Sequence, residues 1–203
     1  MKTTPMPTPD LHTLPGPGDI TQAALPNGIT LLVRSNPNSP SVFIGGHLPC
    51  GALYDPTDKL GLANFTALAL LRGTSHYTFQ QIYDLLESNA ASLSFGGGTH
   101  TVGFSGRALS EDLSLLLDML MEALYFPSFP PEEVERLRTQ LLTGLAIRAQ
   151  DTAEMASITF DQIVFEGHPY SLPEDGGSET VSRITHQDLG AFHTRHYGPA
   201  GMV

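Results

Sequence analysis

The sequence is poor in cysteine, in basic residues and in long apolar runs, and each shortage excludes a class of protein. Its one cysteine, Cys50, rules out an intramolecular disulfide and is typical of a small buried apolar residue. Ten Lys and Arg stand against 21 Asp and Glu, a formal net charge of −11, so the chain has no basic surface for nucleic acid. It has no run of about 18 apolar residues, so we expect no membrane-spanning helix.

The N-terminal residues, MKTTPMPTPDLHTLPGPGD, lack the apolar core of a secretory signal, which makes the cytoplasm the default expectation. Five of the first 17 residues are proline, and we predict that residues 1–19 form an extended tail. The rest of the chain is apolar enough, at 40% overall, to build a core. We therefore expect a single domain from 20 to 203.

The order of the expected strands and helices indicates an α+β domain. Asn27-Gly28 between the runs 20–25 and 29–34 is a strong hairpin signal, and a third strand is expected at 41–48. Further strands, at about 91–95 and 99–107, flank Gly96-Gly97-Gly98, a run typical of a turn, a bulge or a close approach of another backbone. The expected helices span 60–74, 79–89, 111–125, 131–150, 153–165 and a segment from 185, with N-caps at Thr78, Ser110 and Thr185. Grouped strands and helices predict two layers, a mainly antiparallel sheet with helices on one face.

The stretch 60–74 is apolar on nearly every side, and a helix of that kind belongs in a core. Its frame, G-L-A-x-F-x-x-x-x-L-x-x-G-T, resembles the signature helix of the M16 (insulinase/pitrilysin) zinc-peptidase family. L-P-N-G before a strand, G-x-x-x-D before the helix and Y-x-P-x-G-M-V at the end extend the resemblance over 20–203. It implies the α+β fold of the M16 metallopeptidase domain (LuxS/MPP-like).

In that family the frame carries the inverted zinc motif H-x-x-E-H, and the corresponding positions here are Asn64, Ala67 and Leu68. The family's third ligand is a glutamate from a later helix. Aligned through residues 167–170 (G-H-P-Y), its position falls on Gly144. An amide, two aliphatic side chains and a glycine do not make a catalytic zinc site. The resemblance therefore implies a degenerate, non-catalytic member with no cofactor of its own.

The resemblance also implies a role for such a member. We expect it to support a zinc-bearing partner, either a separate M16 subunit or its own C-terminal half, in peptide or protein degradation. In the family a strand at the sheet edge receives the substrate backbone, and here this strand corresponds to Leu93, Ser94, Phe95, Gly96 and Gly97. The residues by themselves also fit a flexible hairpin tip. Because the family continues with a strand where this sequence stops, we expect a domain truncated from a longer chain.

One alternative stays open, a zinc-dependent metalloendopeptidase with an atypical metal site. His193 and His196 lie three residues apart in the last expected helix, a spacing that can share a metal. The sequence offers no third ligand beside them, so ordinary surface histidines are the simpler interpretation. Glu154, Asp161 and Glu166 approach a helical spacing of carboxylates, which is typical of a solvated helix face.

Overall fold

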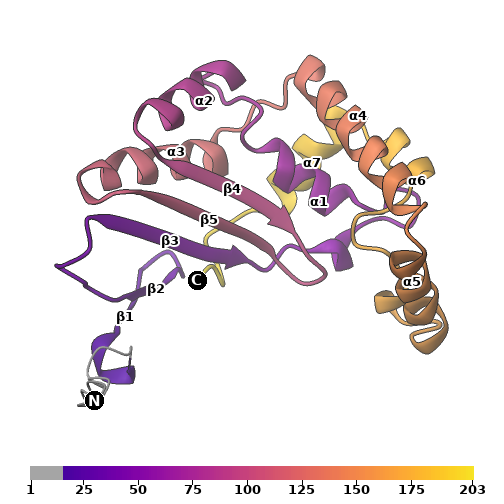
Figure 1. The fold of residues 1–203 in the computed structure, drawn as a ribbon, viewed down its shortest axis with the longest axis horizontal. Coiled ribbons are helices and arrows are strands. Elements are labelled where there is room, and N and C mark those ends of the chain that lie inside the picture. Colours follow the sequence, from indigo (N-terminus) through magenta and orange to yellow (C-terminus); the bar gives the residue numbers. More distant parts are fainter. Residues whose placement is uncertain (1–15) are drawn as a thin grey trace, which may run out of the picture.

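The central sheet has three antiparallel strands. The computed structural model describes residues 16–203. Residues 1–15 of the extended tail predicted at 1–19 lie outside them, and the rest of that tail includes a 3-10 turn at Pro17–Asp19. Strands β3 (Ser41–Leu48) and β4 (Ser92–Gly97) both pair with β5 (Val102–Leu109), so the order is β3-β5-β4 (Figure 1). The strand predicted at 41–48 has the predicted bounds.

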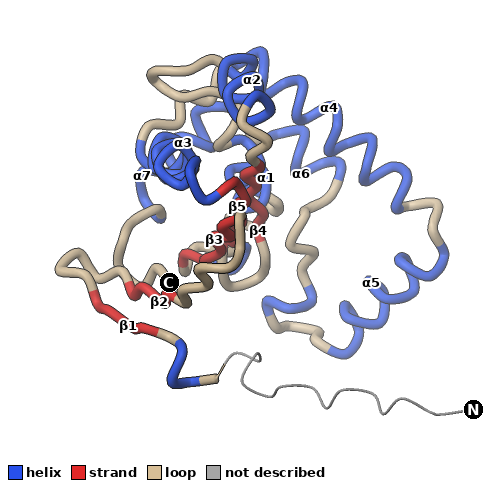
Figure 2. The backbone as a smooth tube through the Cα atoms, turned by 60° about the vertical axis from the view of Figure 1, so that its left-hand side comes forward, coloured by secondary structure: helices blue, strands red, loops and turns tan. Residues whose placement is uncertain are grey.

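Alternation along these strands gives the sheet one apolar face. On β5, Val102, Phe104 and Ala108 are buried, whereas Arg107 is exposed. The helices lie over the buried face, and the opposite face, with Phe43 71% exposed, carries none of them (Figure 2). The predicted two-layer α+β architecture is confirmed.

A separate hairpin joins β1 (Thr21–Ala24) to β2 (Thr30–Val33), as the Asn-Gly signal predicts. Gly28 adopts φ +94°, a left-handed conformation that the turn requires and glycine supplies without strain. The C-terminal residues lie beside β3, because Val203 and His47 exchange two backbone hydrogen bonds.

Seven α-helices are described within residues 16–203: α1 (Leu62–Ala69), α2 (Phe79–Ser88), α3 (Leu113–Tyr125), α4 (Pro131–Arg148), α5 (Thr152–Val164), α6 (Ser178–Arg183) and α7 (His186–His196). None of them is both long and apolar enough to cross a membrane. Thr78 and Thr185 cap α2 and α7 as predicted. Ser110 does not cap α3; its hydroxyl donates to the Ser39 carbonyl, and a 3-10 turn (Ser110–Asp112) precedes the helix. The short helix α6 was not predicted.

Helix α1 lies in the core, between β4 and α7. Most of its residues are buried, namely Leu62, Ala63, Phe65, Thr66, Ala67 and Ala69. It is shorter than the predicted 60–74, because the chain tightens after Ala69: the Arg72 amide donates to the Ala69 carbonyl, three residues back. Gly73, with φ +147°, then turns the chain away.

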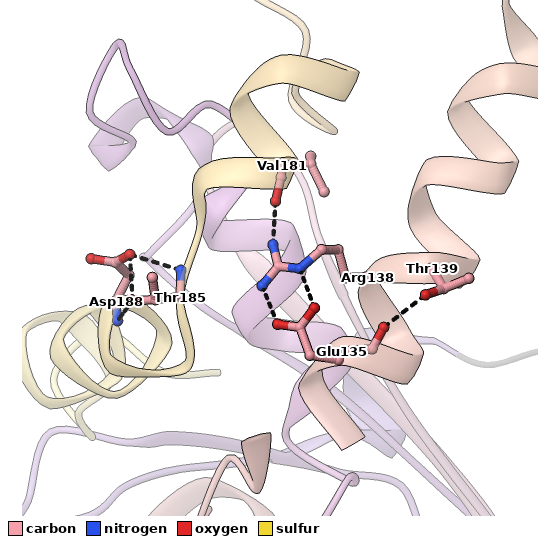
Figure 3. A network of polar contacts seen from close by, with 6 residues as sticks. All are labelled: Glu135, Arg138, Thr139, Val181, Thr185 and Asp188. Atoms are coloured by element: carbon pink, nitrogen blue, oxygen red, sulfur yellow. Dashed lines mark hydrogen bonds and ion pairs between the residues drawn. The ribbon is translucent and has the colours of Figure 1, made fainter. Parts of the chain in front are cut away.

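A polar network joins α4 to α6 close to α1 (Figure 3). The Arg138 guanidinium donates to both carboxylate oxygens of Glu135, each at 2.9 Å, and to the Val181 carbonyl. The same guanidinium lies 5.4 Å from the centroid of the Phe65 ring. Arg138 on α4 therefore holds α6 and α1 together through one side chain.

Candidate functional site

Two of the four positions that the resemblance aligns with the family's zinc site line one small cavity. Asn64 on α1 and Gly144 on α4 lie 80 residues apart in sequence, yet both border a cavity of about 270 Å³. The other lining residues are Gln140, Leu141, Leu145, Arg148 and Asp175. The fold thus brings together the two positions that the family resemblance pairs.

A chain of hydrogen bonds fills the polar side of this cavity. The Asn64 side-chain oxygen accepts from the Gly97 amide at 3.1 Å, and its nitrogen donates to Asp175 Oδ1 at 2.9 Å. Arg148 Nη1 donates to Asp175 Oδ2 at 2.7 Å. The amide, carboxylate and guanidinium therefore tie together α1, the end of β4, the loop before α6 and the end of α4.

Gly97 shows how closely α1 approaches β4. A Cβ atom placed on Gly97 would lie 2.5 Å from the Asn64 Cα, so no side chain fits at this position. Of the turn, the bulge and the close backbone approach that the run Gly96-Gly97-Gly98 can mark, the structure shows the close approach at Gly97. Gly96 and Gly97 belong to β4, and the turn comes later, where the Gly98 amide donates to the Thr101 carbonyl.

The remaining two positions of the inverted motif offer no donor atom. Ala67 is 1% exposed, and Leu68 is half-buried and packs against the core. Neither side chain holds a lone pair for a metal or a proton. The neighbouring Thr66 hydroxyl donates to the Leu62 carbonyl within the helix, so it does not face the cavity as a free ligand.

The residues present do not fit a zinc ion. Around the cavity only Asp175 is a carboxylate, and it already accepts from Asn64 and Arg148. Across residues 16–203, no three or more His, Cys, Asp or Glu side chains gather closely enough to hold a metal. A catalytic zinc site needs about three such ligands and an open position, and Arg148 adds a positive charge beside the cavity.

The proposed peptide-binding residues, Leu93 to Gly97, lie on the outer strand of the sheet. Among residues 16–203, β4 pairs only with β5, so its other edge faces no strand. Leu93 and Phe95 point into the core, while Ser94 is exposed on the open face, with its hydroxyl 2.9 Å from that of Ser105. At the end of this edge, the Gly97 amide meets Asn64, so edge and cavity are contiguous.

His193 and His196 do not converge on a shared site. The Nε2 atom of His193 lies 2.9 Å from the Leu124 carbonyl, and burial lowers the pKa of this imidazole. Its ring packs on Tyr197, with centroids 4.7 Å apart. The His196 ring instead stacks on Tyr54, at 4.8 Å. Both histidines are used for packing.

Sequence reasoning assigned no role to two carboxylates that bond to α1, Asp175 and Asp55. Asp175 lies 111 residues from Asn64 and follows no local motif, so only the fold reveals their contact. Asp55 accepts from the amides of Gly61 and Ala63, each at 2.8 Å, and so caps α1; burial raises the pKa of this carboxyl to about 6. The aspartate of the G-x-x-x-D pattern could have indicated that cap.

Cys50 is buried, and its burial raises the pKa of the thiol to about 11. A thiol that remains protonated at neutral pH is a poor nucleophile. This agrees with the sequence interpretation of Cys50 as a small apolar residue.

Comparison with known proteins gives one matching family model, described as insulinase (peptidase family M16), over residues 30–166. An uncharacterized zinc protease of Mycobacterium leprae is 26% identical over 185 residues, which are 91% of this chain and 41% of that protein. The mitochondrial cytochrome b-c1 complex subunit 1 of Rattus norvegicus is 24% identical over 184 residues, 89% of this chain and 38% of that protein. The chain thus spans less than half the length of these relatives.

Solved structures give the same fold. A peptidase M16 inactive domain from Pseudomonas fluorescens superposes with a TM-score of 0.84 and 22% identity, covering 91% of this chain and 45% of that one. Pitrilysin superposes with a TM-score of 0.76 and 23% identity, covering 90% of this chain and 20% of that one.

Proposed function

This chain belongs to the insulinase family of peptidases, M16, and we propose that it acts in that family as a non-catalytic domain that supports a zinc-bearing partner in peptide degradation. The partner is a separate M16 subunit or the other half of a longer protein. On this proposal the zinc ion belongs to the partner, and this chain supplies a rigid wall and a strand edge for peptide.

The observation that carries the proposal is the hydrogen-bonded chain at the cavity. Where an active member would cross-link two helices through zinc, Asn64, Asp175 and Arg148 link α1 to α4 through side chains of this protein. Arg148 and Asp175 keep the cavity close to neutral, and they satisfy each other's hydrogen-bonding groups. A site built this way keeps its shape without a metal, which suits a structural role.

The descriptions of two similar proteins support a non-catalytic role. The Pseudomonas fluorescens structure is described as an inactive domain of peptidase M16, and the rat protein is a subunit of the cytochrome b-c1 complex. Both descriptions concern those proteins. They nevertheless give a precedent for retaining the fold within a larger assembly or chain.

A peptide would add to the free edge of β4 as a further strand. Main-chain hydrogen bonds give such binding its affinity, and they need no particular side chain on the receiving strand. The exposed residues Ser94 and Gly96 are small, so the strand presents no bulky group on the open face. We therefore propose low sequence selectivity for the peptide at Leu93–Gly97.

Zinc binding provides the first test. We expect the unmodified chain to retain no stoichiometric zinc after dialysis, measured by elemental mass spectrometry, and to hydrolyse no peptide by itself. The triple variant Asn64→His/Leu68→His/Gly144→Glu should instead bind one zinc per chain, because it supplies two ligands at the cavity and a third one helical turn from position 64. Ala67 is left unchanged, which avoids placing a carboxylate in the core.

A matched control moves the third ligand by one residue. In Asn64→His/Leu68→His/Thr143→Glu the glutamate leaves the cavity side of α4, since one helical residue is a rotation of about 100°. We expect this control to bind zinc much more weakly. One zinc per unmodified chain would overturn the proposal, and tighter binding by the control would show that Gly144 is not the ligand position.

The partner requires a separate measurement. Native mass spectrometry on the protein purified from its own source reads the partner mass and the bound metal together. We expect a heteromeric assembly, or a longer single chain, whose zinc content is assigned to residues outside 16–203. No association at micromolar concentration and no zinc in any linked domain would contradict the supporting role.

A further inference from the structure

Helix α5 shows its apolar side to solvent. Phe160, Ile163 and Val164 are 63%, 70% and 54% exposed, and Met155 is 39% exposed. No residue of the helix is buried. In both views of the backbone α5 stands at the margin of the molecule, away from the sheet (Figures 1 and 2). We name the four side chains of Met155, Phe160, Ile163 and Val164 the α5 apolar face.

The opposite side of α5 carries its charges and faces the protein. Glu154, Ile158, Asp161 and Phe165 follow a spacing of four, three and four residues, which places them on one side of the helix. All four line a hollow of about 500 Å³ between α5 and the segment 170–175. This side therefore combines two carboxylates with two apolar side chains, whereas the α5 apolar face points toward water.

Such an orientation is unfavourable for an isolated domain. Most helical stability in proteins comes from packing the apolar face, and α5 leaves that face uncovered. Scattered exposed apolar residues are common, but three large ones within five positions on one helix form a contiguous patch. A patch of this kind marks a surface that another molecule covers.

Charge decides which molecule fits. From 149 to 182 the sequence has no Lys or Arg, and it has seven carboxylates: Asp151, Glu154, Asp161, Glu166, Glu174, Asp175 and Glu179. Asp175 and Glu179 pair with Arg148 and Arg183, which flank this range, so five carboxylates remain in excess. A second copy would set the same negative charges against these, and an anionic membrane would do likewise. A segment that is apolar along one side and flanked by Lys and Arg meets both the apolar groups and the surrounding charge.

We propose that the α5 apolar face docks a basic amphipathic segment of a partner protein. The inference rests on the proposed function for the existence of a partner, and it adds where the partner binds and by what chemistry. Phe160 and Ile163, the most exposed of the four, are the central contacts. The carboxylates around the helix provide attraction at longer range and accelerate association.

The test uses a defined probe and the complete 203-residue chain. The probe is a fluorescein-labelled 14-residue helix of leucine and lysine with one apolar side, and binding is followed by fluorescence anisotropy. We expect saturable binding that weakens as salt is raised, because the attraction is partly between exposed charges. Phe160→Ser/Ile163→Ser should weaken it at least about tenfold, the loss typical of central interface residues.

Three controls separate this surface from general stickiness. Phe43→Ser removes an equally exposed aromatic group from the open sheet face, and binding should stay unchanged. Glu154→Gln/Glu166→Gln should weaken binding a few-fold at low salt, with less effect at high salt. A leucine–glutamate helix of the same length should not bind. Circular dichroism checks that each variant is folded, as expected for exposed positions.

Several outcomes would overturn the proposal. They are absence of binding by the lysine helix, equal binding by the glutamate helix, and equal loss in Phe43→Ser. Sedimentation showing self-association that disappears in Phe160→Ser/Ile163→Ser would make a second copy the occupant. Flotation with phosphatidylglycerol vesicles, lost in the same variant, would make it a membrane. None of these readouts depends on zinc, so this inference and the supporting role can fail separately.

Discussion

Helices α1 and α5 both carry several apolar side chains, but the two helices have opposite surroundings. In α1 six of eight residues are buried, whereas in α5 none of thirteen is. The amides at the start of each helix donate to an aspartate, the distant Asp55 for α1 and the N-cap Asp151 for α5. An apolar helix face indicates that something covers that face. Whether residues of the same chain cover it depends on the fold.

The contrast also separates two kinds of surroundings. Around α1, most residues pack closely against β4 and α7, and Asn64, Ala67 and Leu68 carry no imidazole or carboxylate. In α5 no residue is buried, and four apolar side chains are at least 39% exposed. The first region supplies the core of the domain, and the second is the surface for which we propose a partner.

The largest expected effect is a loss of stability, and it tests directly whether α1 is packed and α5 is not. Phe65→Ala removes a 0% exposed ring from the core and should lower the free energy of unfolding by about 3–5 kcal/mol. Phe160→Ala, at 63% exposure, should change it by no more than about 0.5 kcal/mol. Urea denaturation followed by circular dichroism measures both. Similar losses for the two variants would mean that α5 is packed in solution by this chain itself.

Local sequence signals predicted much of the fold. The hairpin at Asn27-Gly28, the strand at 41–48 and the caps at Thr78 and Thr185 are confirmed, because each depends on residues within a few positions. The failures depend on distant contacts. Ser110 bonds to Ser39 across the sheet end instead of capping its own helix.

The residues of the candidate site also fall into those that the sequence predicted and those that only the fold revealed. The family frame gave Asn64 and Gly144, and the fold places both on one cavity. The frame could not give Arg148 or Asp175, since their ion pair depends on how a loop 27 residues later returns to α4. The resemblance placed Gly97 in the edge strand, but it could not show why a glycine stands there, because the reason is the proximity of α1.

Substitutions at Gly97 and Gly144 should have intermediate effects on stability, because Gly97 lies in close contact with α1 and Gly144 has open space around it. Gly97→Ala would place a Cβ 2.5 Å from the Asn64 Cα, so α1 or β4 must shift, at a cost of about 1–3 kcal/mol. Gly144→Ala meets nothing within 4 Å and should stabilise α4 by up to about 1 kcal/mol. Thermal unfolding midpoints should therefore move in opposite directions. A neutral Gly97→Ala would show that α1 does not press on β4.

The smallest expected effect concerns the two aspartate caps. Burial raises the pKa of Asp55 to about 6 in the folded protein, above the ordinary value of 3.8. The folded state therefore holds this proton more tightly than the unfolded state does. The stability that it contributes is complete below about pH 3.8 and is lost as the pH rises through 6. Partial solvent access reduces the change to about 1 kcal/mol.

Comparison of the unmodified chain with Asp55→Asn isolates this contribution. Asparagine can still accept from the α1 amides but does not titrate here, so the stability difference between the two proteins should fall between pH 4 and 7 and then level off. His193 acts in the opposite sense, since its lowered pKa costs stability as the pH falls, but both proteins contain it and its effect cancels. Asp151→Asn, at the exposed cap of α5, serves as the matched control. An equal pH dependence in both asparagine variants would mean that burial of the α1 cap, the feature that distinguishes the two helices, does not set the proton affinity of Asp55.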